Sequence, residues 1–543
     1  MKKSILIILA LINILGSCKA QNRETKNIEV LNTVWETINT EYFDATFNGL
    51  NWQKEYEYYK PIIGACKSND SLYFYLNQMV FKLNVSHLGV VSPEEANESG
   101  DPQLYFDGTL GMEVRYLKDE AVIISVQKNS SAANAGIKPG FTLFEVNGKT
   151  IKSFVIEKEN NPTPPFNSRN RRSLISQNIY REFYGEPGDI IGLKYFDNNN
   201  KIHKVELELK GRGMQKINII PEMPAMYASV DNRIINSNTA YIHFDAFLPH
   251  ILDSTLKTIN KYINYPNLII DLRGNPGGVF EVRKAIAEQF VSETTLFWKY
   301  YRRGNTNEVF LNPSKNSYKG NLVILIDERS TSSSEEFSGG MKAIERATII
   351  GQQTPGKVLT MEVVPLPEGA YFIYPIQQTI TAKDDILEAI GVIPDISVEL
   401  NKDSLLIGVD NQLNRAIEFL SKNNIPRYQS TIEQLVSAFY NAGLNKSIKL
   451  YFNIKEQYPW KAHKYVLNDF GYYLLSNSKN KQAIQIFELN TKEYPDSANA
   501  FDSLGEAYMK NNNRKLAIKN YEKSLELNPD YSNASEMLKK LKN

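Results

Sequence analysis

The stretch Asn321–Lys357, NLVILIDERSTSSSEEFSGGMKAIERATIIGQQTPGK, decides the fold that the sequence predicts. It opens with an apolar run, Leu322 to Ile326, whose length suits a buried strand better than a helix. A polar turn holding Ser332 follows, and then an amphipathic helix pattern that Ser334 can cap. A second apolar run ends at Gly351. This order of strand, turn, helix and strand predicts a layered α/β sheet with Ser332 near a helix N-terminus.

A serine in that place suits nucleophilic catalysis. Backbone N–H groups and the helix dipole at a helix N-terminus can stabilise an oxyanion beside the hydroxyl group. The alternative is an ordinary Ser-rich loop, because such turns are common in proteins without catalytic function. This stretch alone leaves both interpretations open.

The composition excludes some classes of function. A chain of 543 residues with 42% hydrophobic residues has room for several globular domains. Lys and Arg total 62 against 61 Asp and Glu, so no overall charge favours nucleic acid. His203, His243 and His250 have no Cys or His partner at metal-ligand spacing. We therefore expect no structural metal, and no cofactor is implied.

The first residues predict export. A basic start, Met1 to Lys3, precedes an apolar stretch, Ser4 to Leu15, which is too short to span a bilayer comfortably. The following Leu-Gly-Ser-Cys resembles a bacterial lipoprotein processing box. The resemblance implies a signal peptide over 1–17, a lipid anchor at Cys18, and a location in the bacterial cell envelope, periplasmic or outer-membrane-associated. An ordinary signal peptide is the alternative. Only Cys66 remains, so no intrachain disulfide is expected.

Two regions precede the α/β pattern. Residues 18–100 have a helical, aromatic-rich pattern that ends at Ser86 and His87. Residues 101–210 change to short strands and turns and resemble a PDZ domain. That resemblance implies that a loop with Leu110, Gly111 and Met112 binds the C-terminal carboxylate of a peptide, which adds to the sheet as a strand. A small β domain without peptide affinity is the alternative. Within this region, 153–185 has prolines and a basic trio, and we expect a solvated loop or lid.

The third region, 211–402, contains a second Gly-rich turn. The buried-strand pattern from Leu268 leads into Asp-Leu-Arg-Gly-Asn-Pro-Gly-Gly, which ends at Gly278. Such a turn lets the backbone approach a ligand closely. It lacks the Lys-Ser/Thr of a P-loop, so an oxyanion-binding N–H group is the alternative to a phosphate cradle.

The C-terminal region is a repeat. Gly471, Ala483, Phe487 and Pro495 recur 34 residues later as Gly505, Ala517, Tyr521 and Pro529. This is the tetratricopeptide (TPR) period, so we expect a linker over 403–428 and about three stacked helix pairs over 429–543.

Together, the two turns and the Gly-x-x-Thr-x-Gly-Lys motif resemble the tail-specific (C-terminal processing) serine peptidases and the related tricorn core proteases. The resemblance implies an α/β multidomain protein with a ClpP/crotonase-like peptidase core, a helical N-terminal region, a PDZ-like domain and C-terminal TPR repeats. It assigns Ser332 as the nucleophile and Lys357 as its base. Oxyanion N–H groups map to Ser333 and to the pair Gly277 and Gly278, of which Gly278 is favoured.

The sequence departs from the processing peptidases at one position. Where they have a glutamine that orients the lysine, this chain has Met361. Tricorn-type members instead use a Ser-His pair and a glutamate, which map to Ser86, His87 and Glu388. Imidazole is a base near neutral pH, whereas lysine must first be desolvated. We therefore favour Ser332, His87 and Glu388, assisted by Ser86, with Lys357 as the alternative base.

These features predict a serine endopeptidase of the cell envelope. Its partners would be protein or peptide substrates held by their tails on the PDZ domain, a protein partner on the TPR repeats, and the membrane through the lipid anchor. The alternative is a catalytically inactive lipoprotein scaffold that binds proteins through its PDZ and TPR domains. The scaffold would need neither Ser332 nor the two glycine turns.

Overall fold

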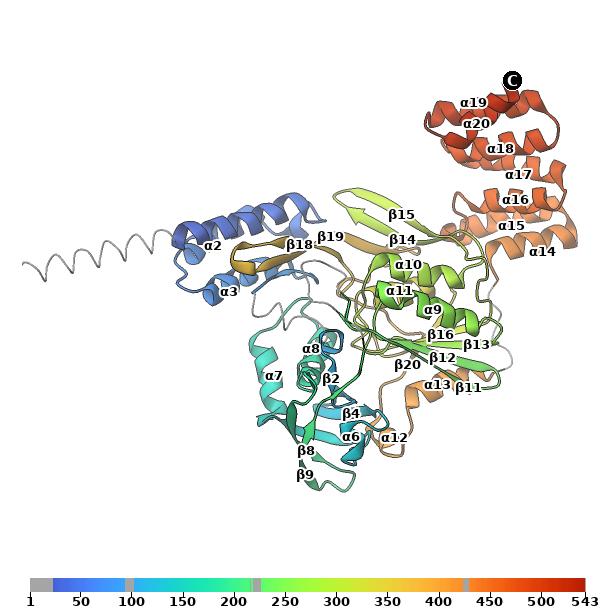
Figure 1. The fold of residues 1–543 in the computed structure, drawn as a ribbon. Coiled ribbons are helices and arrows are strands. Elements are labelled where there is room, and N and C mark those ends of the chain that lie inside the picture. The colour runs from blue at the N-terminus through green and yellow to red at the C-terminus, as the bar shows by residue number, and fades with distance from the viewer. Residues whose placement is uncertain (1–22, 93–101, 215, 218–225, 423–428, 543) are drawn as a thin grey trace, which may run out of the picture. The chain divides into compact units, whose positions relative to one another are not determined.

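The computed structural model describes residues 23–92, 102–214, 216–217, 226–422 and 429–542. The chain forms two compact units (Figure 1). Unit 1 comprises the described residues of 1–286, 298–308 and 320–425, and unit 2 comprises those of 287–297, 309–319 and 426–543. The predicted signal peptide and Cys18 lie outside the described residues. None of the helices in the described ranges is both long and apolar enough to cross a bilayer.

A six-stranded sheet forms the centre of unit 1, in the order β11-β12-β13-β16-β17-β20. Its strands are β11 (Val230–Asn236), β12 (Thr239–Phe244), β13 (Asn267–Asp271), β16 (Asn321–Ile326), β17 (Thr348–Gly351) and β20 (Ile396–Ser397). All neighbours are parallel except β11 and β12. Parallel strands are buried on both faces, which explains the continuous apolar runs in the sequence. The predicted α/β core is therefore confirmed.

Helices cover both faces of this sheet (Figure 1). One face carries α9 (Pro249–Lys261), α10 (Phe280–Ala287) and α11 (Ser333–Ala343). On the other face, Val323 and Ile350 pack with Ala416 and Leu420 of α13 (Asn411–Leu420). The segment 403–428, which the sequence predicts as a linker, thus contains a helix of the core.

The N-terminal helices share a core with a distant hairpin. They are the helix over 23–41, α2 (Trp52–Gly64) and α3 (Asn69–Val80), followed by the strand β1 (Gly89–Val91). The hairpin consists of β18 (Thr360–Pro365) and β19 (Tyr371–Thr381), and β1 pairs with β19. The pairing brings the end of the helical region, with Ser86 and His87, to residues almost 300 positions later in the chain.

The β region of unit 1 forms a sheet in the order β3-β4-β5-β8-β9, with β6 beside β5. Its strands are β3 (Met112–Leu117), β4 (Glu120–Val126), β5 (Thr142–Val146), β6 (Lys149–Thr150), β8 (Ile190–Phe196) and β9 (Ile202–Glu208). The expectation of a solvated loop or lid over 153–185 is wrong. The segment folds into most of α7 (Ile151–Asn160) and all of α8 (Ser168–Arg181), and Ile175 and Ile179 are fully buried in the domain core. Its arginines and polar residues obscure this short apolar stripe in the sequence.

Unit 2 is a helical region, as predicted. Its helices are α14 (Thr431–Ala442), α15 (Leu444–Gln457), α16 (Val466–Ser476), α17 (Asn480–Glu493), α18 (Ala498–Lys510), α19 (Arg514–Leu527) and α20 (Ser532–Lys542). A Cβ at Gly471 would lie 2.7 Å from the ring of Phe487, so the repeated glycine allows two helices to pack closely. Glu293 accepts the N–H groups of Thr431 and Ile432, at 2.8 and 2.6 Å, and thereby ties 287–297 to the start of α14.

Candidate active site

Ser332 lies in the tight turn between β16 and α11. Its φ and ψ of 55° and −121° are unusual for a residue with a side chain, and its N–H donates to Lys357 O at 2.9 Å and to Glu335 Oε2 at 3.1 Å. The helix begins at Ser333, so its N-cap is Ser332 and not Ser334. Ser334 Oγ instead donates to the carbonyl of Asn275 at 2.9 Å, which links this turn to the Gly-rich turn.

Ser86, His87 and Glu388 form one hydrogen-bonded chain. Ser86 Oγ donates to Glu388 Oε2 at 2.9 Å and lies 3.0 Å from His87 Nδ1, while the Ser86 N–H donates to Glu388 Oε1 at 2.6 Å. Ser86 is fully buried, and His87 has a φ of 53°. The structure therefore brings these three predicted residues together, with Ser86 between the carboxylate and the imidazole.

Ser332 and His87 line the same cavity, which has a volume of about 620 Å³. In the described residues no hydrogen bond joins their side chains, and catalytic hydrogen bonds often form only when substrate is bound. Met361, at the position where the processing peptidases have a glutamine, lines this cavity. The walls are largely apolar, and their apolar side chains are Leu104, Tyr105, Met226, Leu248, Pro276, Val279, Phe280, Leu359 and Met361.

Two backbone N–H groups beside the cavity can bind an oxyanion. Among the described residues, the N–H groups of Gly278 and Ser333 have no hydrogen-bond partner. The N–H of Gly277 differs, because it donates to Asn275 Oδ1 at 2.9 Å. Gly277 is required for another reason: its φ is 101°, and a Cβ there would lie 2.7 Å from Ser332 Cβ. Of the predicted glycine pair, only Gly278 has an available donor.

The electrostatic environment differs between the two candidate bases. Burial lowers the pKa of His87 to about 3, and the nearby cation of Lys357 acts in the same direction. Burial also lowers the pKa of Lys357, whereas the carboxylates of Glu335 and Glu388 raise it. Burial raises the pKa of Glu388 to about 7, against the hydrogen bonds from Ser86 and Val358. His87 is thus a neutral base over the physiological range.

The position of the Lys357 side chain does not favour it as the base. Lys357 is absent from the residues that line the cavity, although its carbonyl holds Ser332. Its N–H donates to Glu335 Oε2 at 2.8 Å, and the next N–H, of Val358, donates to Glu388 Oε2 at 3.1 Å. The backbone of Lys357 and Val358 therefore connects the Ser332 turn to Glu388.

Sequence reasoning missed a buried polar cluster beside Ser333. Arg283 of α10 pairs with Glu336 of α11 and donates to the Tyr300 hydroxyl at 2.7 Å. Thr379 Oγ1 donates to Glu336 Oε1 at 2.6 Å. These residues lie on four separate elements and carry no common motif, so no local signal in the sequence could have identified them.

The predicted peptide-binding loop has its N–H groups engaged. The Leu110 N–H donates to Phe183 O at 3.2 Å, and the Gly111 N–H donates to Thr109 Oγ1 at 3.1 Å. Met112 begins β3, which pairs with β4, and the N–H of Tyr116 further along β3 donates to Ser176 Oγ of α8 at 2.9 Å. A peptide tail that added to β3 at this point would have to displace α8.

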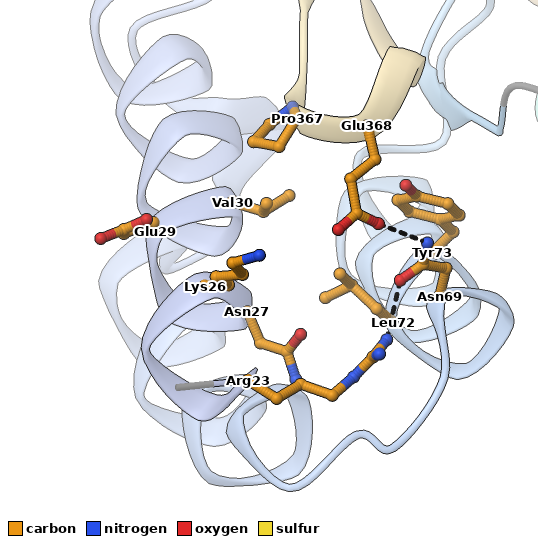
Figure 2. Close-up of a pocket in the computed structure, with 10 residues that line it drawn as sticks. All are labelled: Arg23, Lys26, Asn27, Glu29, Val30, Asn69, Leu72, Tyr73, Pro367 and Glu368. Atoms are coloured by element: carbon orange, nitrogen blue, oxygen red, sulfur yellow. Dashed lines mark hydrogen bonds between the residues drawn. The ribbon is translucent and has the colours of Figure 1, made fainter. Parts of the chain in front are cut away.

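A second cavity, of about 440 Å³, lies among the N-terminal helices and the β18–β19 turn (Figure 2). A chain of hydrogen bonds crosses it, from Arg23 Nη2 to Asn69 Oδ1 and from Asn69 Nδ2 to Glu368 Oε2, each 2.7 Å long. None of the predicted site residues lines this cavity. The described part of the chain also contains no cluster of His, Cys, Asp and Glu that could hold a metal ion.

Two family models match separate parts of the chain, and one of them includes site residues. The model of peptidase family S41 matches residues 238–398, which include Ser332 and Glu388, and the model of the tricorn protease C1 domain matches residues 24–81. The chain is a serine peptidase, and the part that matches family S41 is residues 238–398.

Three known proteins are similar over most of this chain. It is 22% identical over 417 residues to carboxyl-terminal-processing peptidase 3, chloroplastic, of Arabidopsis thaliana, covering 74% of this chain and 75% of that protein. It is also 22% identical over 394 residues to the carboxyl-terminal-processing protease of a Synechocystis species, covering 71% and 84%. A crystal structure of a CPAF mutant shares the fold, with a TM-score of 0.50 at 13% identity, covering 77% of this chain and 98% of that one. The predicted serine peptidase is thus confirmed.

Proposed function

We propose that this serine peptidase is an endopeptidase that hydrolyses peptide bonds of protein or peptide substrates, with Ser332 as its nucleophile. The observation that carries the proposal is the hydrogen-bonded chain from Glu388 through Ser86 to His87, which ends at the cavity that Ser332 lines. A nucleophile, a base and a group that orients the base are the parts that acyl transfer requires.

The proposed reaction has two steps. Ser332 Oγ attacks the carbonyl carbon of the substrate while its proton passes to His87, and the N–H groups of Gly278 and Ser333 bind the oxyanion. His87 then gives the proton to the leaving amine, which leaves an acyl-enzyme. Water hydrolyses this ester by the same path in reverse order, with His87 as the base again.

His87 suits this role because it is neutral before the reaction and can be stabilised after it accepts a proton. Burial holds its pKa at about 3, so the free enzyme carries the base form. When the imidazole becomes charged, the ionised Glu388 stabilises it through Ser86 Oγ. Lys357 then contributes its backbone carbonyl to the Ser332 turn, and its cation near His87 limits protonation of the resting enzyme.

The proposal also includes where the enzyme acts and what it binds. We propose that Cys18 carries the lipid anchor that its sequence context predicts, and that the enzyme acts in the bacterial cell envelope. The PDZ-like domain would engage substrate tails after α8 separates from β3, and the TPR-like helices would bind a protein partner. The scaffold without activity is not favoured, because Ser332, His87 and Gly278 converge on one cavity.

The test is labelling by an alkyl fluorophosphonate together with turnover of casein. Wild type should label and cleave, whereas Ser332→Ala should do neither while keeping the unfolding temperature of wild type. His87→Ala should lose nearly all activity and Lys357→Ala should keep a measurable part of it. If Lys357→Ala is inactive and His87→Ala labels and cleaves normally, the lysine is the base. Casein turnover that survives Ser332→Ala would exclude this site.

A further inference from the structure

The two oxyanion donors come from separate segments that a side chain joins directly. Ser333 Oγ donates to the carbonyl oxygen of Gly278 at 2.8 Å, and the two residues are 55 positions apart in the chain. Each of them also provides one of the free N–H groups. Ser333 therefore contributes in two ways. Its backbone N–H is one oxyanion donor, and its hydroxyl holds Gly278, whose N–H is the other donor.

The backbone around Gly278 is fixed on its opposite side. Phe247 N–H donates to Gly277 O at 2.7 Å, and Val279 N–H donates to Phe247 O at 2.8 Å. Because this is a strand-like bridge, the N–H and C=O of Gly278 itself face away from Phe247, toward Ser333. A Cβ at Gly278 would lie 2.3 Å from Phe247 O, so the approach requires glycine.

Arg283 extends this link from one helix to the other. It lies in the first turn of α10, where its N–H donates to Val279 O, and its Nη1 lies 3.4 Å from Ser333 Oγ. Its guanidinium also pairs with Glu336, one turn after Ser333 in α11. Arg283 and Glu336 are only 2% and 5% exposed, so water does not screen the pair. One cation thus contacts both the hydroxyl and the helix of the Ser333 segment.

We propose that Ser333 Oγ and Arg283 are positioning groups that set the spacing between the N–H donors of Gly278 and Ser333. Both residues line the cavity, and the proposal assigns the contact with the oxyanion to the two N–H groups and not to these side chains. Ser333 Oγ acts on Gly278 through the carbonyl, and Arg283 acts through Ser333 Oγ and Glu336. The inference rests on the proposed function, because it concerns the oxyanion site of the same reaction. It assigns to Arg283 a role in the chemical step, not in substrate binding.

The test separates the rate of the chemical step from binding. Ser333→Ala keeps the N–H and removes only the hydroxyl, so the maximal rate of fluorophosphonate labelling should fall by about 10-fold, a part of the effect of deleting a donor outright. The reagent concentration at half-maximal rate should stay within about two-fold. Arg283→Met should lower the same rate, and Arg283→Lys, which keeps the charge, should restore part of it. The rate of the double variant should fall by less than the product of the two single effects, because both changes remove the contact through Ser333 Oγ.

Ser338→Ala is the matched control. Ser338 is a buried serine of the same helix, but its hydroxyl donates to Ser334 O at 2.6 Å within the helix. Ser338→Ala should label at the wild-type rate. A Ser333→Ala enzyme that labels as fast as Ser338→Ala, or one whose half-saturating concentration changes while its maximal rate does not, would overturn the inference while leaving the proposed function intact. A wild-type enzyme that does not label at all would overturn both.

Discussion

Glu388 binds both the backbone N–H and the hydroxyl of Ser86, at 2.6 and 2.9 Å, across 302 positions of the chain. Each carboxylate oxygen takes one of these two bonds. Glu388 therefore holds Ser86 by two bonds. Through the Ser86 hydroxyl, the Glu388 carboxylate can stabilise a positive charge on the His87 imidazole without contacting it. Positioning by two bonds of this kind reduces the freedom of the base before substrate arrives.

The pH dependence of activity should follow Glu388. Its pKa is raised to about 7, so the carboxyl group is protonated below that pH and ionised above it. His87, with a pKa of about 3, stays neutral throughout this range. We expect kcat/KM to rise with pH through about 7, because only the ionised Glu388 stabilises the protonated imidazole. Glu388→Gln should have lower activity and lack this transition in a profile from pH 5 to 8. A transition that persists in Glu388→Gln and disappears in Lys357→Ala would contradict the assignment.

Ser86→Ala should impair the chemical step without affecting binding. The change removes the hydroxyl bridge but keeps the N–H bond to Glu388. We expect kcat to fall by roughly 10- to 100-fold, less than in His87→Ala, with KM nearly unchanged. Ser86→Thr, which retains a hydroxyl, should recover part of the rate. Equal losses in Ser86→Ala and in His87→Ala would argue against a secondary role for Ser86.

A buried ion pair near the Gly-rich turn should be important for stability. Arg115 Nε of β3 lies 2.8 Å from Asp327 Oδ2, at the end of β16, and both side chains are fully buried. Asp327 Oδ1 also accepts the N–H of Gly274. Arg115→Leu removes the cation that is hydrogen-bonded to this carboxylate and should lower the free energy of unfolding by about 3–5 kcal/mol. Urea unfolding measures the change. The surface pair of Lys149 and Glu157 offers a control, because Lys149→Leu should change it by less than about 1 kcal/mol.

Substitution of the two repeated glycines by alanine should destabilise their helices to different degrees. A Cβ at Gly471 would lie 2.7 Å from the Phe487 ring, and one at Gly505 would lie 3.0 Å from the Tyr521 ring. Alanine favours helices by about 1 kcal/mol over glycine, but overpacking costs about 1–3 kcal/mol. We expect Gly471→Ala to destabilise α16 and α17 and Gly505→Ala to have a smaller effect. Hydrogen exchange of peptides from these helices measures both, and Gly192→Ala, with open space at its Cβ, is the control.

The sequence predicts the parts of the fold that repeat a period or a motif. The runs from Leu268 and Leu322 are strands because both sheet faces are buried, and the 34-residue period yields helix pairs. It does not predict α8, whose buried stripe contains Ser173 and Ser176 among arginines. Polar residues that are buried through hydrogen bonds look like surface residues in a sequence.

In the candidate active site, too, the sequence predicts some residues and not others. The resemblance to the processing peptidases and tricorn core proteases identifies Ser332, His87 and Glu388. In the structure Ser332 and His87 line one cavity, and Glu388 is linked to His87 through Ser86. Arg283 and Glu336 carry no such marker, since each looks like a charged residue on a helix surface. Their burial depends on packing between α10, α11 and β19, which only the folded chain reveals.

The bonds from Glu293 to the start of α14 have a consequence for how this protein can be divided. Because 287–297 and 309–319 belong to unit 2 while 298–308 belongs to unit 1, the chain passes between the units several times before its last helices. A cut after the peptidase match at residue 398 would remove α13 from the sheet and strip Glu293 of its partners. A fragment that ends there would therefore lack parts of both units, so the peptidase match does not mark a unit that can be cut out of the chain.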